Sequence, residues 1–223
     1  MSVKGNLLRL RATLPESVTL VAVSKTMPAA MITEAYGAGQ RDFGENYVQE
    51  MAAKAAELPA DIRWHFIGHL QANKVKYIAP FVNLIHGVDS LKLLLEINKQ
   101  ALKNRREIRV LLQLRVAAEE TKFGLSFDEC RALLQSAELP GLEHVKIAGL
   151  MAMASNTENS EQVRREFISV KNFHASVLPL CPGLDILSYG MSGDYQLAVE
   201  TGSNMVRVGS LIFGERKYND GPA

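Results

Sequence analysis

Short apolar runs alternate with amphipathic helical stretches along the whole chain, and this alternation is the strongest constraint on its fold. Strands that are each followed by a helix pair in parallel, because the helical crossover returns the next strand in the same direction. Eight runs predict such strands, at residues 18–24, 41–44, 63–67, 82–86, 108–114, 146–151, 186–189 and 205–208. The helices predicted between them include residues 28–38, 47–57, 90–104, 126–137 and 160–177.

Eight βα units in 223 residues predict an α/β fold, a single closed (β/α)8 TIM barrel in which residues 1–223 form one domain. An open doubly wound sheet is the alternative, and its nucleotide-binding form carries a glycine-rich turn that opens a helix after the first strand. Here Gly37-Ala-Gly39 ends a helix instead. Within the helical pattern, Ser90 and Ser126 are predicted N-caps, and Pro28 suits a first-turn position.

The charge balance excludes several classes of partner. Lys and Arg total 25 against 24 Asp and Glu, so a net charge of +1 provides no field that attracts nucleic acid or an anionic membrane. No window approaches membrane-spanning length, and the N-terminus has no signal-peptide pattern. Cys130 and Cys181 have neither a metal-type nor a redox spacing. We therefore expect a cytoplasmic monomer without a metal site, whose ligand is a small molecule.

Lys25 follows the first predicted strand directly, at the end of a buried apolar run. An ammonium group there costs free energy unless a partner, or a covalent bond to a carbonyl carbon, compensates. Schiff-base chemistry is therefore one interpretation of this lysine. A solvated residue at the end of the strand is the other.

The loops after the seventh and eighth predicted strands have the composition of a phosphate site. Barrels commonly bind phosphate there, beside the N-terminus of a short helix. Gly190 and Gly193 flank Ser192, whose hydroxyl can donate to a phosphate oxygen. Gly209 and Ser210 open a segment that can form one helical turn, whose free N–H groups favour an anion. Either loop alone is also compatible with an ordinary glycine turn.

A phosphate site opposite a strand-end lysine describes a site for a phosphorylated carbonyl compound, and pyridoxal 5′-phosphate (PLP) is the leading candidate. Arg207 would then lie under the ring and hydrogen-bond the pyridine nitrogen. A charged arginine disfavours a protonated pyridinium and weakens the ring as an electron sink. The alternative for Arg207 is an ion pair inside the barrel with Glu45 or Glu200. A Schiff-base aldolase acting on a sugar phosphate is a more distant interpretation of the same site.

Seven ordered blocks of sequence resemble the pyridoxal phosphate homeostasis protein family, which is related to the N-terminal barrel domain of alanine racemase. The blocks are AVSKT at 22–26, FGENYVQE at 43–50, WHFIG at 64–68, LQANK at 70–74, GLM at 149–151, GMS at 190–192 and MVRVGSLIFG at 205–214. The chain differs from the family pattern at Ser210, where threonine is expected, and at His69, where proline is common. Serine retains the hydroxyl donor, and a surface position is expected for His69.

The resemblance implies both the cofactor and the residues that hold it. It makes Lys25 the Schiff-base lysine, and it implies cofactor contacts at Asn46, Met191, Ser192, Arg207, Gly209 and Ser210. It implies a carrier that buffers PLP and delivers it to PLP-requiring apoenzymes, with no catalytic residues of its own. The alternative is a PLP-dependent amino-acid racemase or another weak PLP enzyme. A lone strand histidine such as His65 is expected to be a core residue more than a cofactor contact.

Overall fold

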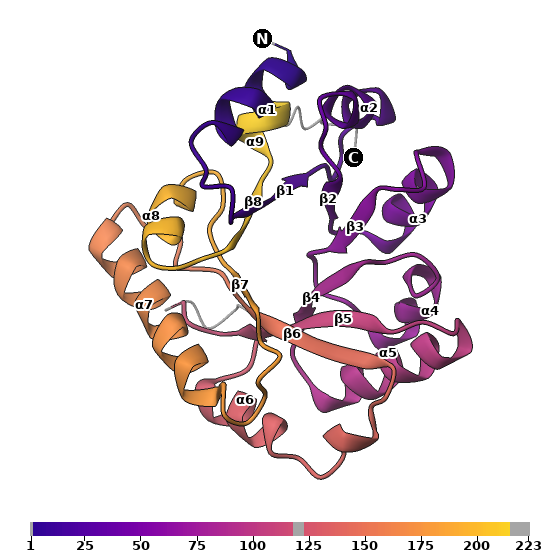
Figure 1. Ribbon diagram of the computed structural model, residues 1–223, viewed down its shortest axis with the longest axis vertical. Helices are drawn as coiled ribbons and strands as arrows, with labels where there is room; N and C mark the ends of the chain where they lie inside the picture. The colour runs from indigo at the N-terminus through magenta and orange to yellow at the C-terminus, as the bar shows by residue number, and fades with distance from the viewer. Residues whose placement is uncertain (1, 118–122, 215–223) are drawn as a thin grey trace, which may run out of the picture.

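The computed structural model describes residues 2–117 and 123–214, which form a closed barrel of parallel strands surrounded by helices (Figure 1). The strands are β1 (Thr19–Val23), β2 (Asp42–Glu45), β3 (Arg63–Phe66), β4 (Leu84–Val88), β5 (Ile108–Leu114), β6 (Val145–Ala152), β7 (Ile186–Ser188) and β8 (Met205–Val208). They pair in chain order, and β8 closes the barrel against β1. The predicted closed barrel is therefore confirmed, and the open-sheet alternative is wrong.

Helices fill the connections and form the outer layer in Figure 1. They are α1 (Val3–Arg11), α2 (Ala29–Gly37), α3 (Val48–Glu57), α4 (Val75–Ile78), α5 (Leu91–Lys103), α6 (Phe127–Leu134), α7 (Ser160–Val177), α8 (Tyr195–Glu200) and α9 (Ser210–Phe213), with two 3-10 turns, η1 (Ala72–Lys74) and η2 (Leu139–Gly141). No helix within the described ranges 2–117 and 123–214 is long and apolar enough to cross a membrane.

Side-chain caps set where two of the helices begin. The Ser90 hydroxyl accepts the first-turn N–H of α5, and Ser126 forms a reciprocal capping box with Glu129 in α6. Both predicted N-caps are thus confirmed. Pro28 lies one residue before α2 as its N-cap, in an extended conformation, so the first-turn placement predicted for it was wrong by one position.

Strands β1, β2, β3, β6 and β7 differ from their predicted bounds by one residue, and the largest difference is at β4. Strand β4 begins at Leu84, two residues later than predicted, because Val82 belongs to the turn that ends α4. Its N–H donates to the Ile78 carbonyl at 2.8 Å. Val82 is fully buried, so its apolar character does not distinguish a turn from a strand. Strand β5 and strand β8 have the predicted bounds.

The apolar core has two layers, one between strands and helices and one inside the barrel. The outer layer contains most of the buried side chains. The inner layer is smaller and consists of Val21, Leu84, Leu111, Ala148, Met151, Ile186 and Met205. Because both faces of each strand are covered, the strands are nearly continuous apolar runs. Polar side chains share the barrel interior with this inner layer, among them His65, His86 and Arg207.

The N-terminal helix α1 lies beside the C-terminal helix α9 and beside α2, although the first two are at opposite ends of the described chain (Figure 1). The Asn6 side-chain amide donates to the Ile212 carbonyl in α9 at 3.0 Å. The backbone N–H of Lys4 donates to Glu34 in α2 at 2.9 Å. Helix α1 therefore supports the short turn that follows β8, where Gly209 and Ser210 lie.

Candidate functional site

All seven residues predicted to bind a cofactor line one cavity of about 460 Å³. The sequence places them far apart, and the barrel brings them together: Lys25, Asn46, Met191, Ser192, Arg207, Gly209 and Ser210. Val23, Ile67 and Met153 complete the lining and give the cavity an apolar side. The predicted residues thus form one site in space, and the sequence analysis missed its three apolar members.

The cavity lies at the carboxyl ends of the strands, which is the end where barrels of this type build their sites. Lys25 lies two residues beyond β1, and Asn46 comes directly after β2. Ile67 and Met153 come directly after β3 and β6. The same rule that predicted Lys25 and Asn46 would have predicted these two residues, had it been applied to apolar side chains.

Two close-packed loops bring hydroxyl and glycine residues to one wall of the cavity. Gly190 has a φ of +98°, and a Cβ there would lie 2.5 Å from the Ala198 Cβ, so the loop after β7 requires glycine. The Ser192 hydroxyl lies 3.4 Å from the Gly209 N–H. Helix α9 begins at Ser210, and its first N–H groups have no partner within the helix. These groups together form a wall of hydrogen-bond donors.

Arg207 lies in β8 and points into the barrel under this wall, with only 4% of its surface exposed. Its Nη1 donates to the Ser188 carbonyl at 2.8 Å and to the Ser188 hydroxyl at 2.7 Å, and its Nη2 donates to the Ala152 carbonyl at 3.0 Å. Burial lowers the pKa of Arg207 to about 10, against the opposing effect of the Asp194 charge. The guanidinium therefore remains charged at neutral pH.

The predicted alternative for Arg207, an ion pair with Glu45 or Glu200, is wrong. Glu45 pairs with Lys54 at 2.8 Å, and Glu200 pairs with Arg164 at 3.0 Å. Arg207 is instead held by neutral acceptors from β6 and β7.

Asn46 lines the cavity and carries a buried acceptor beside it. Its Oδ1 is buried, with no hydrogen-bond partner among the described residues. The loop that carries it packs tightly on Gly68, since a Cβ on Gly68 would lie 2.5 Å from the Asn46 carbonyl oxygen. A buried amide oxygen without a partner is costly in a folded protein. This oxygen is an unsatisfied acceptor in the wall of the cavity.

A buried ionic cluster lies behind Lys25, and the sequence analysis did not predict it. The Lys54 Nζ donates to the Ser24 carbonyl at 2.8 Å, to Glu45 at 2.8 Å and to Glu50 at 2.7 Å. The Ser24 hydroxyl donates to Glu45 at 2.6 Å. Burial raises the pKa of Glu45, although the hydrogen bonds from Lys54 and Ser24 oppose the shift. One feature of the sequence indicated this cluster. Lys54 lies on the buried face of α3, together with the apolar Val48 and Met51.

The cluster also holds the backbone after Lys25. Thr26 has a φ of +65°, a conformation that β-branched residues rarely adopt. Its N–H donates to Glu50 at 2.6 Å, and its hydroxyl donates to the Lys25 carbonyl at 2.6 Å. Strained backbone of this kind persists only where surrounding contacts determine it, and it is frequent at functional sites. The hydrogen bonds of Thr26, on the side of Lys25 away from the cavity, therefore hold the Lys25 backbone in place.

The two histidines considered in the sequence analysis lie in different environments. His65 is buried, with ring nitrogens 3.0 Å from Asp42 and 3.0 Å from His86, and it lies at the opposite end of the barrel from Lys25. It is a core residue, as expected. His69 is on the surface, as also expected, where its ring stacks on Phe123 with centroids 4.0 Å apart.

Acid is expected to destabilise the protein through Asp42. Burial alone would raise the pKa of this carboxyl, but hydrogen bonds and charges from Arg63 and His65 outweigh burial and lower the pKa to about 2. A carboxylate with a lowered pKa in the folded state stabilises the fold above its unfolded-state pKa, near 3.9, and this contribution is lost as the pH falls through the folded-state value. When the pH falls from about 5 to about 1, the wild type should therefore lose about 2 kcal/mol more of its free energy of unfolding than Asp42→Asn does, as measured by urea unfolding. Asp185→Asn, at an exposed position, is the control, and equal pH slopes for Asp42→Asn and the wild type would contradict the prediction.

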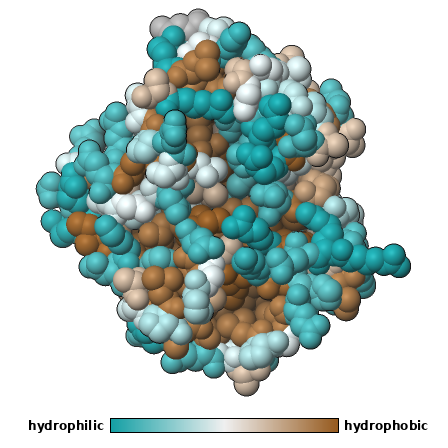
Figure 2. Space-filling view, in the orientation of Figure 1, coloured by the Kyte–Doolittle hydropathy of each residue, from teal (hydrophilic) through white to brown (hydrophobic). Residues whose placement is uncertain are grey.

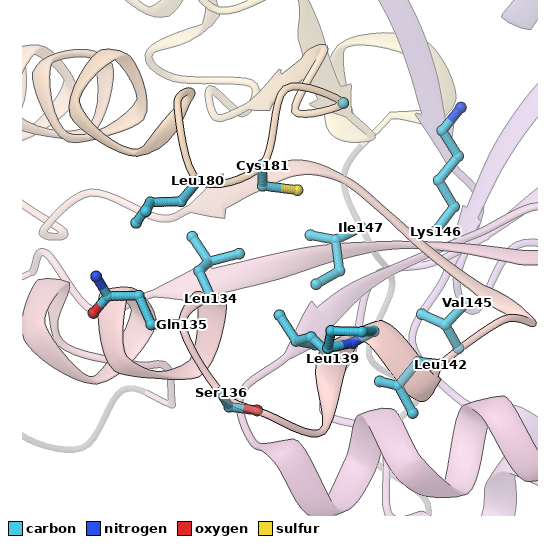
Figure 3. A pocket seen from close by; sticks show the side chains of 12 residues that line it. Leu134, Gln135, Ser136, Leu139, Leu142, Val145, Lys146, Ile147, Leu180 and Cys181 are labelled. Carbon is cyan, nitrogen blue, oxygen red and sulfur yellow. The ribbon is translucent and has the colours of Figure 1, made fainter.

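A second cavity, of about 560 Å³, lies on the flank of the barrel between the end of α6, η2 and the start of β6 (Figure 3). Leu134, Leu139 and Ile147 point into it, and it is the hydrophobic hollow in the lower half of the face in Figure 2. Burial raises the pKa of the Cys181 thiol at its edge, which disfavours the reactive thiolate. This cavity shares no lining residue with the one that holds Lys25.

Comparison with known proteins defines first the class of barrel and then the family. The family model of the alanine racemase N-terminal domain matches residues 2–217. The alanine racemase of Clostridium difficile has the same fold, with a TM-score of 0.77 at 16% identity over 98% of this chain and 58% of that one. The barrel is therefore of the alanine racemase N-terminal class.

Relatives with higher sequence identity show to which family within this class the chain belongs. A pyridoxal phosphate homeostasis protein of Vibrio alginolyticus is 40% identical over 211 residues, which cover 92% of this chain and 89% of that protein. PipY of Synechococcus elongatus, solved without PLP, has a TM-score of 0.90 at 40% identity over 96% of this chain and 100% of that one. Its structure with PLP bound has a TM-score of 0.85 at 39% identity, with the same coverage. The chain belongs to the pyridoxal phosphate homeostasis protein family.

Proposed function

We propose that this protein binds PLP in the cavity at the carboxyl ends of the strands and serves in cytoplasmic PLP homeostasis. The observation that carries the proposal is that one cavity gathers Arg207 of β8 with a lysine and two serine hydroxyls that follow the ends of β1, β7 and β8. These are the groups that an aldehyde, a pyridine nitrogen and a phosphate require. The relatives' names, and the PLP bound in the PipY structure, support the same ligand.

Each residue has a role that follows from its place in the cavity. Ser192, Ser210 and the Gly209 backbone would hold the phosphate, and Arg207 would donate to the pyridine nitrogen. The Lys25 amine, in its neutral form, would form a C=N bond to the aldehyde carbon, and the aldehyde oxygen leaves as water. Bound in this way, PLP supplies a reactive C=N bond that can be passed to another amine.

The remaining groups of the cavity also fit PLP. The unpartnered Oδ1 of Asn46 can accept a hydrogen bond from a ring hydroxyl. Met191 and Ile67 offer apolar surface to the flat ring. The residues present therefore match the chemistry of PLP over its whole length, from phosphate to aldehyde.

The cavity favours a carrier over a catalyst. Arg207 keeps its proton at neutral pH and can only donate, so it opposes protonation of the pyridine nitrogen and weakens the ring as an electron sink. Racemisation and decarboxylation depend on that sink. We therefore propose that residues 1–223 act as a single-domain, monomeric carrier that buffers PLP and delivers it to PLP-requiring apoenzymes, without robust turnover of amino acids.

The proposal predicts a covalent adduct at a single lysine. PLP added to the purified protein is expected to give a visible absorbance band, and borohydride reduction should fix the adduct on Lys25, located by mass spectrometry of peptides. Amino-acid turnover measured on the same sample separates a carrier from an enzyme. An adduct scattered over exposed lysines such as Lys99 and Lys171, or a sugar-phosphate turnover without an absorbance band, would overturn the proposal.

A further inference from the structure

A chain of buried hydrogen bonds crosses the barrel from its amino-terminal end to Arg207. Asp42 Oδ1 lies 3.0 Å from His65 Nε2, and His65 Nδ1 lies 3.0 Å from His86 Nε2. His86 Nδ1 lies 3.2 Å from the Ser188 hydroxyl, which accepts from Arg207 Nη1 at 2.7 Å. Four strands contribute to this chain before it reaches β8, and we call Asp42, His65, His86 and Ser188 the relay.

With both histidine rings neutral, the donors and acceptors of the relay fit together in one direction. Ser188 accepts from the arginine, so its own hydroxyl hydrogen is free to donate to His86 Nδ1. His86 then carries its hydrogen on Nε2 and donates to His65 Nδ1, and His65 donates from Nε2 to the Asp42 carboxylate. Burial holds the pKa of His86 well below its usual range, so that ring is neutral. A carboxylate only accepts hydrogen bonds, and it therefore fixes the direction of the chain at its far end.

The relay and Arg207 together connect two different cavities. Arg207 lines the cavity with Lys25. Asp42 and His65 line a polar cavity of about 330 Å³ at the amino-terminal ends of the strands, together with Arg63 and Arg109. His65, His86 and Ser188 are almost fully buried and the Asp42 side chain is 12% exposed, so most of the bonds between them lie in a medium of low polarity. Hydrogen bonds in such a chain polarise and strengthen one another.

We propose that Asp42, His65, His86 and Ser188 are positioning residues for Arg207 and, through it, for the pyridine ring. This inference rests on the proposed function. The guanidinium is held by two carbonyl oxygens and the Ser188 hydroxyl, and the relay determines which way that hydroxyl points. Arg207 therefore meets the ring in one orientation, with its remaining N–H groups available to the cavity.

The hydrogen-bond direction is tested by nitrogen NMR of the histidine rings in the full-length protein without PLP. The expected result is hydrogen on Nε2 and none on Nδ1 for both His65 and His86. Addition of PLP should shift the ring-nitrogen signals of both histidines, although neither histidine lines the Lys25 cavity. Hydrogen on Nδ1 of His86, or histidine signals unchanged while the absorbance band forms, would overturn the inference.

Ser188→Ala is the matching variant, because it removes the hydroxyl and leaves both carbonyl contacts of Arg207 in place. Loss of one hydrogen bond predicts PLP retention about 3- to 10-fold weaker, and the response of His65 to PLP should disappear. Ser169→Ala is the control, because that hydroxyl donates only to a main-chain carbonyl within α7. Equal retention and an intact His65 response in Ser188→Ala would overturn the relay alone. Absence of a Lys25 adduct in the wild type would overturn the proposed function as well.

Discussion

Lys25→Ala is expected to abolish the covalent PLP adduct completely and to leave the barrel folded. Among the described residues that line the Lys25 cavity, this amine alone can form a C=N bond to an aldehyde. The side chain lies beyond the end of β1, so its removal leaves the pairing of β1 with β2 and β8 unchanged. We expect stability to change by less than about 1 kcal/mol. Absorbance on titration with PLP and urea unfolding measure the two effects.

Lys54 also lies close to this site, and the structure explains why it should not replace Lys25. Its Nζ donates to Glu45, Glu50 and the Ser24 carbonyl within 2.8 Å, so all three of its N–H donors are used by the buried cluster. Only a neutral amine attacks an aldehyde. Lys99→Ala, at an exposed position on α5, is the control and should keep the full absorbance band. A band of unchanged intensity in Lys25→Ala would contradict the site.

The site could be predicted because the order of the strands in a closed barrel determines where the residues that follow them lie. Residues that follow strands must meet at one end of a closed parallel sheet, however far apart they are in sequence. Lys25 and Ser210 are brought to one cavity by that geometry alone. The prediction needed only the approximate ends of the strands, and an error of one or two residues, as at β4, did not matter.

The relay and the ionic cluster could not be predicted in the same way. His86 and Ser188 are 102 residues apart and Lys54 and Glu45 are 9 apart, and neither pairing has a sequence pattern. Burial of a polar side chain depends on a specific partner, which is settled only when strands and helices pack. His65 accordingly resembled an ordinary core histidine, and no pattern in the chain indicates that it belongs to a hydrogen-bond chain ending at Arg207.

Gly149→Ala is expected to destabilise the protein by at least about 3 kcal/mol, the largest loss of stability that we predict for a single methyl group. Gly149 lies in β6 opposite Ile186 in β7. A Cβ at this position would lie 1.9 Å from the Ile186 carbonyl oxygen and 2.7 Å from its carbonyl carbon. Both are backbone atoms, so no rotamer change relieves the clash, and the two strands must separate.

The separation would also disturb the Lys25 cavity, since β7 leads into the loop that carries Ser192 and provides the Ser188 carbonyl to Arg207. We therefore expect weaker PLP retention in whatever fraction of Gly149→Ala remains folded. Gly37→Ala is the matched control, because a Cβ at that helical position meets no atom within 4 Å and φ is ordinary there. It should leave the protein as stable as the wild type or raise its stability by up to about 1 kcal/mol. Equal urea midpoints for the two variants would mean that separating β6 from β7 does not lower the free energy of unfolding. That result would contradict close packing of the two strands at Gly149.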